Sequence, residues 1–227
     1  MNIKRTITAV ILAVAAVTPS ALAAGFADTR GHWAEDIINE LADKGVVNGI
    51  SATQFNPDGT VTRAEFLRMS LSAAGIETDV PYREGECLDV RGDAWYAPTV
   101  QSALDKGLIP ENMIDGFGVE VVTGEDSAKA VYSGSLNAET PIKREEMAYI
   151  AQAALQYGTS YDKVDSLSTP DDLSFSDTYA ISSWAIDGVR HAYANSLIAG
   201  MDDNTFRPKE TATRAQAAVI IRNILNR

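Results

Sequence analysis

Apolar residues recur at intervals of three and four positions in paired stretches of the chain, and polar, turn-rich segments separate the stretches. Such spacing places apolar side chains on one face of a helix. The apolar positions are Trp33, Ile37, Ile38, Leu41 and Ala42, then Phe66, Leu67 and Met69, and near the C-terminus Trp184, Val189, Ala192, Tyr193, Ala217, Ile220, Ile221 and Ile224. The pattern therefore predicts units of helix, loop and helix.

The first and last units are copies of one repeat. A shift of 151 positions aligns them without a gap from Trp33 and Trp184 onward. The aligned pairs include Gly49 with Gly200, Phe55 with Phe206, Pro57 with Pro208, Thr62 with Thr213, Arg63 with Arg214 and Ala64 with Ala215. Internal repetition at a fixed period is typical of repeat architectures.

A middle copy is present in altered form. Asp89 and Trp95 stand at the expected positions, but Arg144 follows Trp95 by 49 residues, whereas the equivalent spacing is 30 in the other copies. The 19 extra residues lie within 111–140, where β-rich runs flank a polar turn. We expect residues 111–140 to form a surface hairpin that the core does not need. This copy also lacks the Phe-x-Pro turn of its neighbours.

The three copies occupy residues 24–79, 83–157 and 172–227. One unit of this size buries little apolar surface by itself, so three units sharing a core are expected. The predicted fold is mainly α, a pseudo-threefold bundle of three helix-loop-helix repeats with a small β-hairpin insertion in the second. Residues 1–23, with Lys4 and Arg5 before an apolar run and a small-residue cleavage site, read as a secretory signal peptide.

Charge and composition exclude several classes of partner. After residue 23 the chain has 17 basic and 31 acidic residues, a net charge of −14, which argues against a nucleic-acid partner. No later segment is long and apolar enough to suggest a membrane span. Cys87 is the only cysteine, which excludes an intramolecular disulfide and leaves a cross-linked dimer as an alternative.

The start of each second helix combines two kinds of chemistry. Thr62 with Glu65, and Thr213 with Gln216, have the spacing of a capping box. Arg63 and Arg214 then fall at the first helical position, where a cation opposes the helix dipole. We expect each arginine to lower stability slightly in the empty protein. Together with unpaired helix amides, its planar fork is expected to form a pocket for a carboxylate.

The ordered motifs Phe-x-Asp, Trp-Ala, Gly, Phe-x-Pro and Thr-Arg-Ala-Glu resemble the S-layer homology domain, in three copies covering essentially all of the chain after residue 23. The resemblance implies a three-lobed helical bundle at the surface of a bacterium. It also implies non-covalent binding to a secondary cell wall polymer that is linked to peptidoglycan and often carries pyruvate ketals. No cofactor or metal is implied.

The resemblance also implies the ligand-binding residues, which lie in grooves between repeats. The arginines Arg63 and Arg214 match the family motif directly, and Arg144 matches in a changed context in which Lys143 and Glu145 replace Thr and Ala. The remaining candidates are Asp28, Asp89 and Asp177, Trp33, Trp95 and Trp184, and Gly49 and Gly200.

Structural roles compete with these assignments. Arg63 is alternatively a bridge to Asp28 or another acid, and the three aspartates alternatively cap the first helices. The pattern favours core anchors over sugar platforms for the tryptophans, because each is predicted to lie on the apolar face of its helix. The acidic turns near Asn56 and Asp203 lack the ligand pattern of a calcium loop and read as turns.

Catalysis is not expected. The two histidines, His32 and His191, have no nucleophile at a recognisable spacing, and the adjacent Glu145 and Glu146 look solvated. The leading hypothesis is a wall-binding protein. The alternative is a structural or assembly component that contacts a surface protein through its acidic surface, the 111–140 insertion or Cys87.

Overall fold

The computed structural model describes residues 25–83, 87–123, 128–158 and 173–227, without the side chains of 119–133. The predicted signal peptide lies outside these residues, as does most of the segment 157–172 that joins the second and third repeats. The helices are α1 (Glu35–Asp43), α2 (Arg63–Ala73), α3 (Ala97–Asp105), α4 (Arg144–Gly158), α6 (Ile186–Ala194) and α7 (Arg214–Leu225), with 3₁₀ turns η1 (Ala27–Thr29), η2 (Glu111–Met113) and η3 (Thr178–Ala180). The predicted mainly α fold is confirmed.

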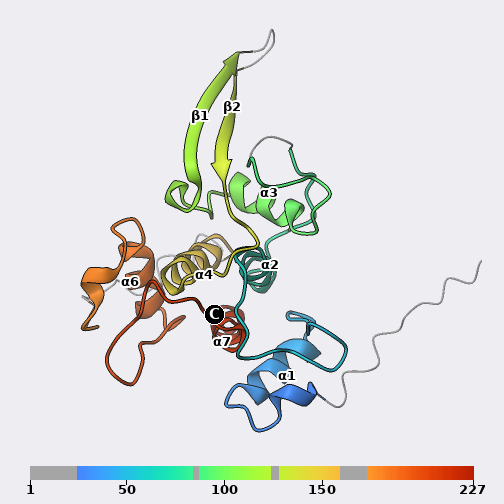
Figure 1. The fold of residues 1–227 in the computed structure, drawn as a ribbon, viewed down its shortest axis with the longest axis vertical. Helices are drawn as coiled ribbons and strands as arrows, with labels where there is room; N and C mark the ends of the chain where they lie inside the picture. Colours follow the sequence, from blue (N-terminus) through green and yellow to red (C-terminus); the bar gives the residue numbers. More distant parts are fainter. Residues whose placement is uncertain (1–24, 84–86, 124–127, 159–172) are drawn as a thin grey trace, which may run out of the picture.

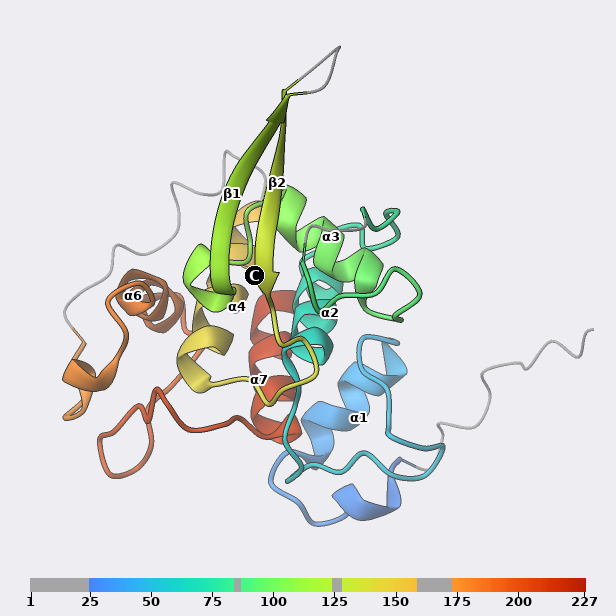
Figure 2. The ribbon, with the colours of Figure 1, turned by 45° about the horizontal axis from the view of Figure 1, so that its top comes forward.

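The helices form a central bundle with three outer lobes (Figures 1 and 2). The second helices of the repeats, α2, α4 and α7, lie at the centre and pack against one another. Each outer helix packs mainly against the central helix of the preceding repeat. Thus α3 lies on α2, α6 lies on α4, and α1 lies on α7, the last helix of the chain. The repeats therefore exchange helices in a closed ring.

A ring of backbone hydrogen bonds marks the pseudo-threefold axis. The Val61 amide donates to the Ala212 carbonyl at 3.2 Å, Ala212 donates to Ile142 at 3.0 Å, and Ile142 donates back to Val61 at 3.0 Å. All three residues are fully buried. Each segment leading into a central helix thus satisfies a buried donor and a buried acceptor on the other two.

The insertion in the second repeat forms an antiparallel hairpin of β1 (Asp115–Thr123) and β2 (Ala128–Ser135) that projects from the body (Figure 1). The predicted hairpin is present, but the predicted boundaries 111–140 are too wide. The flanking residues Met113, Ile114, Leu136 and Ala138 are buried in the core. The part outside the core is therefore narrower, about 115–135.

Candidate functional site: grooves between the repeats

Both capping boxes are formed at the central helices. Thr62 accepts from the Glu65 amide at 3.2 Å, and the Glu65 carboxylate accepts from the Thr62 amide at 2.8 Å. Thr213 and Gln216 make the same pair of bonds, each at 3.2 Å. Arg63 and Arg214 are consequently the first helical residues of α2 and α7. The capping boxes thus place each arginine at the first position of its helix.

The expected anion pocket at the helix amides is not formed, because carbonyls of a neighbouring repeat already occupy those amides. The Arg63 and Ala64 amides donate to Thr140 and Ala138 at 3.0 and 2.8 Å. The corresponding amides of α4 donate to Glu210 and Pro208, and those of α7 donate to Gly59 and Pro57. The arginine side chains therefore supply the available donors, and the helix ends do not.

The three aspartates hold the turn that makes these contacts. The Asp28 carboxylate accepts from the Phe55 and Asn56 amides at 2.9 and 2.7 Å. Asp89 accepts from Leu136 and Asn137 in the same way, and Asp177 accepts from Phe206 and Arg207. The alternative that these aspartates cap the first helices is wrong, since α1, α3 and α6 begin after Ala34, Tyr96 and Ala185, each without a side-chain cap.

Burial opposes ionisation of Asp28, but the amide hydrogen bonds from Phe55 and Asn56 outweigh it and lower the pKa of this carboxyl. Both carboxylate oxygens accept hydrogen bonds from the turn. Asp28 therefore positions the turn whose Phe55 carbonyl accepts a hydrogen bond from Arg214. A direct contact with a ligand stays a prediction for all three aspartates.

The second repeat has an equivalent turn that the sequence disguises. Leu136, Asn137 and Ala138 replace Phe-Asn-Pro and Phe-Arg-Pro of the other copies, and Asn137 has a φ of 53°, close to 60° at Asn56 and 57° at Arg207. The expectation that this copy lacks the turn is therefore wrong. The available signal was position, because each turn begins eight residues before its arginine.

Arg63 is bound by a carboxylate of the protein itself. Its Nε and Nη2 donate to the two oxygens of Glu146 at 3.1 and 2.6 Å, and Nη1 donates to the Leu136 carbonyl at 3.1 Å. The Arg63 side chain is 12% exposed and that of Glu146 is 3% exposed. The structural-bridge alternative holds for this arginine, with Glu146 and not Asp28 as its partner.

The view of Glu145 and Glu146 as solvated residues was wrong, because both are buried. Glu145 accepts from the Ser182 amide at 2.9 Å and pairs with Lys209 at 2.6 Å. The Trp184 ring lies edge-on against Tyr149, with ring centroids 5.7 Å apart, and it is partly buried. Gly188 lies within α6, where a side chain would collide with Tyr149 of α4. At this interface the Arg63 fork is thus bound by Glu146 of α4, and Trp184 packs against Tyr149 of the same helix.

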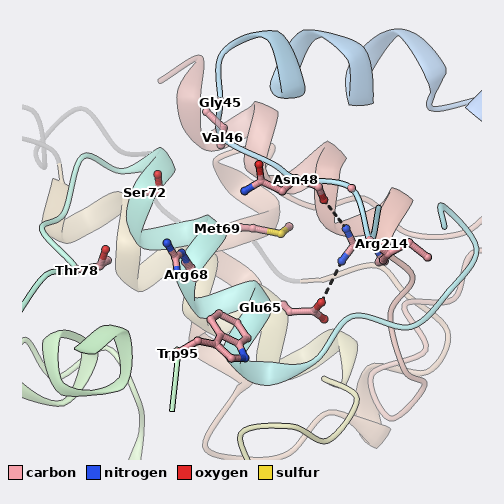
Figure 3. A pocket seen from close by; sticks show the side chains of 12 residues that line it. Gly45, Val46, Asn48, Glu65, Arg68, Met69, Ser72, Thr78, Trp95 and Arg214 are labelled. Atoms are coloured by element: carbon pink, nitrogen blue, oxygen red, sulfur yellow. Dashed lines mark hydrogen bonds and ion pairs between the residues drawn. The ribbon is translucent and has the colours of Figure 1, made fainter. Parts of the chain in front are cut away.

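Arg214 lies beside an open groove (Figure 3). Nε and Nη2 donate to the Phe55 and Asn48 carbonyls, each at 2.8 Å, and Nη1 donates to Glu65 at 3.1 Å. Burial lowers the pKa of the Arg214 guanidinium, and Glu65 partly opposes this. The Arg214 groove has a volume of about 450 Å³, and the residues that line it include Asn48, Gly49, Ile50, Glu65, Arg68, Met69, Ser72, Trp95 and Arg214.

Arg144 lies in a second groove of the same construction. Nε donates to the Phe206 carbonyl at 2.7 Å, and Nη2 donates to Ala199 at 3.2 Å. The guanidinium lies 5.0 Å from the Phe206 ring centroid, much as Arg214 lies 4.6 Å from Phe55. The Arg144 groove has a volume of about 780 Å³, and the residues that line it include Trp33, Arg144, Met147, Ala199, Gly200, Met201, Phe206, Gln216, Val219, Ile220 and Asn223.

Two tryptophans belong to the grooves and not to the core. Trp33 is 63% exposed in the Arg144 groove, and Trp95 is 51% exposed in the Arg214 groove. Both precede their helices, which begin at Glu35 and Ala97. The core-anchor interpretation, which placed them on apolar helix faces, is therefore wrong for these two. Each comes from the repeat whose outer helix covers the adjoining central helix.

Gly49 and Gly200 line the two grooves at equivalent positions. A Cβ atom at Gly49 would lie 2.4 Å from the Phe26 ring, and one at Gly200 would lie 2.5 Å from the Phe175 ring. Glycine is therefore required for close packing of the groove wall against Phe26 in one repeat and Phe175 in the other.

Two other candidates have structural roles. The Cys87 residue is buried, 1% exposed, so its thiol is not presented for a cross-link. The Asp203 carboxylate accepts hydrogen bonds from the Thr205 hydroxyl and the Arg207 guanidinium, and these bonds lower its pKa to about 2.

In the part of the chain that the structure describes, no helix has the length and apolarity needed to cross a bilayer.

Comparisons with known proteins identify a family and relatives that share this sequence. The family model of the S-layer homology domain matches residues 25–67 and 174–218. An exoglucanase of Acetivibrio thermocellus is 35% identical over 89% of this chain and 16% of its own length. An amylopullulanase of Thermoanaerobacterium thermosulfurigenes is 35% identical over 89% of this chain and 10% of its own.

A third relative, the surface-layer 125 kDa protein of Lysinibacillus sphaericus, is 27% identical over 92% of this chain and 16% of its own length. The chain thus spans less than a fifth of each of these three relatives. Enzymes and surface-layer proteins therefore share this portion with the chain.

Proposed function

Because the chain belongs to the S-layer homology family, we propose that it attaches non-covalently to a carboxylate-bearing secondary cell wall polymer through the Arg144 and Arg214 grooves. The family and the surface-layer relatives indicate a secreted protein at the bacterial cell surface. The presence of this portion in an exoglucanase, an amylopullulanase and a surface-layer protein supports a function in attachment that is independent of the rest of each protein. It requires no catalysis, and we assign none to this chain.

The observation that carries the proposal is the pairing of a buried arginine with an exposed tryptophan in each of two equivalent grooves. A guanidinium offers hydrogen bonds matched to a carboxylate, and an exposed indole offers an apolar face with a polar edge. A pyruvate ketal on a sugar combines these features. Since the protein is acidic overall, the attraction must come from such local sites and not from its net charge.

The third interface contributes less to binding in this proposal. Glu146 already occupies the fork of Arg63, and Trp184 packs against Tyr149. A ligand carboxylate there would have to displace a buried acid. We therefore assign binding to two of the three interfaces.

Sedimentation with purified cell wall sacculi tests the proposal. The full chain is expected to sediment with intact sacculi and to remain in solution after the polymer has been chemically stripped. Trp33→Ala and Trp95→Ala should each weaken sedimentation, because both side chains are exposed and their removal spares the core. Tyr179→Ala is the matched control, since Tyr179 is 89% exposed and lines neither groove. Equal sedimentation of stripped and intact sacculi would rule the proposal out.

The projecting hairpin supports a second candidate function, assembly with another surface protein (Figure 1). A protruding antiparallel ribbon exposes strand edges that can pair with a partner. Light scattering of the protein without cell wall distinguishes the candidates. Oligomers that disappear when residues 115–135 are replaced by a short loop would favour assembly.

A further inference from the structure

The two open grooves are built from aligned positions but carry different chemistry. The shift of 151 residues that aligns the repeats also relates Glu65 to Gln216, Arg68 to Val219 and Ser72 to Asn223. All of these residues line their grooves. The Arg214 groove therefore has two cations and one acid in its lining, whereas Arg144 is the only charged residue among the described residues that line the other.

Within the part of the chain that the structure describes, Arg144 has no carboxylate partner, unlike the other two arginines. Arg63 is paired with Glu146 and Arg214 with Glu65, each pair bringing an arginine to the third residue of a neighbouring helix. The third residue of α7 is Gln216, whose oxygen accepts from the Thr213 amide. Among the described residues, Nη1 of Arg144 forms no hydrogen bond, although Nη1 of Arg214 donates to Glu65.

The environment of Arg144 favours an incoming anion. Burial lowers the pKa of its guanidinium, and the acids that act on it in the opposite direction, Glu210 and Asp177, do so through space. Asp177 is already committed to the Phe206 and Arg207 amides. A carboxylate at Nη1 would complete the hydrogen bonding of a buried cation, which is a stronger interaction than a neutral bond.

The wall beyond Arg144 is apolar. Met201, Val219 and Ile220 line the groove where its counterpart has Ile50, Arg68 and Met69. In the Arg214 groove, the Arg68 guanidinium lies 5.8 Å from the Trp95 ring centroid (Figure 3). Val219 leaves the equivalent region of the Arg144 groove without charge. The two walls differ at this position, so an apolar substituent on the ligand meets an uncharged wall in the Arg144 groove but the Arg68 guanidinium in the Arg214 groove.

From these differences we propose that the Arg144 groove is a selective site for a sugar unit that carries a single carboxylate next to an apolar substituent, while the Arg214 groove does not require the substituent. This inference rests on the proposed wall-binding function and makes it more specific. The two grooves then recognise different units or faces of the polymer. Gln216 stands where the other groove has Glu65, and it leaves Arg144 available to the ligand carboxylate. Val219 stands where the other groove has Arg68, and it provides the apolar contact for the substituent.

Titration of the full chain with defined sugars, followed by the indole N–H signals in NMR spectra, tests the inference. Trp33 reports on the Arg144 groove, Trp95 on the Arg214 groove, and Trp184, packed against Tyr149, is the internal control. Trp→Phe variants assign the signals. The probes are a methyl hexoside 4,6-pyruvate ketal, a methyl glucuronide with a carboxylate but no methyl group beside it, and a 4,6-isopropylidene hexoside with methyl groups but no charge.

The Trp33 signal is expected to report tighter binding of the ketal than of the glucuronide, by about fourfold for one buried methyl group. The isopropylidene hexoside, which carries no charge, should bind more weakly than either charged probe. The Trp95 signal should show similar affinities for the two charged probes. Equal affinities of the ketal and the glucuronide at Trp33 would overturn the proposed selectivity.

Two reciprocal variants test the roles of positions 65 and 216. Both glutamate and glutamine form a capping box in this protein, so each exchange is expected to keep the helix cap. Gln216→Glu supplies Arg144 with the partner that Arg214 has, and it should weaken ketal binding at Trp33 roughly 10- to 100-fold. Glu65→Gln should tighten binding at Trp95. No change at Trp33 in Gln216→Glu would contradict the inference.

The outcomes also separate this inference from the wall-binding function. If the chain sediments with sacculi but Gln216→Glu binds the ketal normally, only the inference fails. If the chain neither sediments with sacculi nor responds to any probe, the proposed function fails and the inference fails with it.

Discussion

Arg63→Ala provides a direct test of how the repeats are held together. Sequence reasoning predicts a nearly neutral or slightly stabilising substitution, because a cation leaves a helix N-terminus. The structure predicts the opposite. Arg63 is the bidentate partner of Glu146, whose side chain is 3% exposed, and it also bonds to the Leu136 carbonyl. Its removal leaves a buried carboxylate without its cation.

Removing one partner of a buried ion pair typically costs about 3–5 kcal/mol. For a chain of this size, each kcal/mol lowers the melting temperature by roughly 2–4 °C, so the Arg63→Ala variant should melt about 6–20 °C lower. Arg144→Ala is the matched comparison. It breaks two hydrogen bonds to carbonyls but leaves no carboxylate unpaired among the described residues, so the loss should be smaller.

The double variant Arg63→Ala with Glu146→Gln identifies the source of the cost. Glutamine keeps an oxygen for the Lys143 amide, which Glu146 now satisfies at 3.0 Å, and it removes the buried charge. The double variant should therefore be more stable than Arg63→Ala alone in chemical denaturation. The reasoning is refuted if Arg63→Ala is no less stable than Arg144→Ala, or if Glu146→Gln restores nothing.

Three further predictions concern stability. Thr62→Ala and Thr213→Ala each remove one half of a capping box and should lower the free energy of unfolding by about 1 kcal/mol; unchanged denaturation midpoints would show that the caps are redundant. Replacing residues 115–135 with a short loop should leave one cooperative thermal transition, whereas deleting 136–140 as well should abolish it, since that segment contacts Arg63 and Ala64. The Asp28 carboxyl has a lowered pKa in the folded state, so its stabilisation is present above the ordinary aspartate pKa of about 3.9 and is lost as the pH falls through the folded value. Asp28→Asn should therefore melt below the parent at pH 7 and approach it in acid, and a constant difference between the two melting curves would contradict this assignment.

Local patterns were sufficient to predict the helices, the repeat and the capping boxes. These features depend on neighbours within four residues, or on alignment of one copy with another. The sequence also identified the arginines, but it did not identify what they contact. Arg63, Arg144 and Arg214 all reach across to the turn of the next repeat, and that pairing follows from the exchange of helices around the ring.

The tryptophans show the same limit in another form. Periodicity assigned Trp33 to the apolar face of a helix, but the helix starts two residues later, at Glu35, and the side chain is free to point into a groove formed by two other repeats. The roles of Glu146, which was interpreted as solvated, and of Arg68 were missed because each depends on a partner in another repeat. Alignment of the three central helices would have placed Glu146 beside Glu65 and Gln216.

The hydrogen-bonded ring of Val61, Ile142 and Ala212 limits how many repeats this architecture can hold. Solenoid proteins lengthen by stacking further units on an open end. Here α1 already covers α7, so no end is open. A fourth unit would find no uncovered central helix, and a pair of units would leave one bare. Copy number is therefore set by closure, as strand number is in a barrel, and longer versions must add complete sets of three.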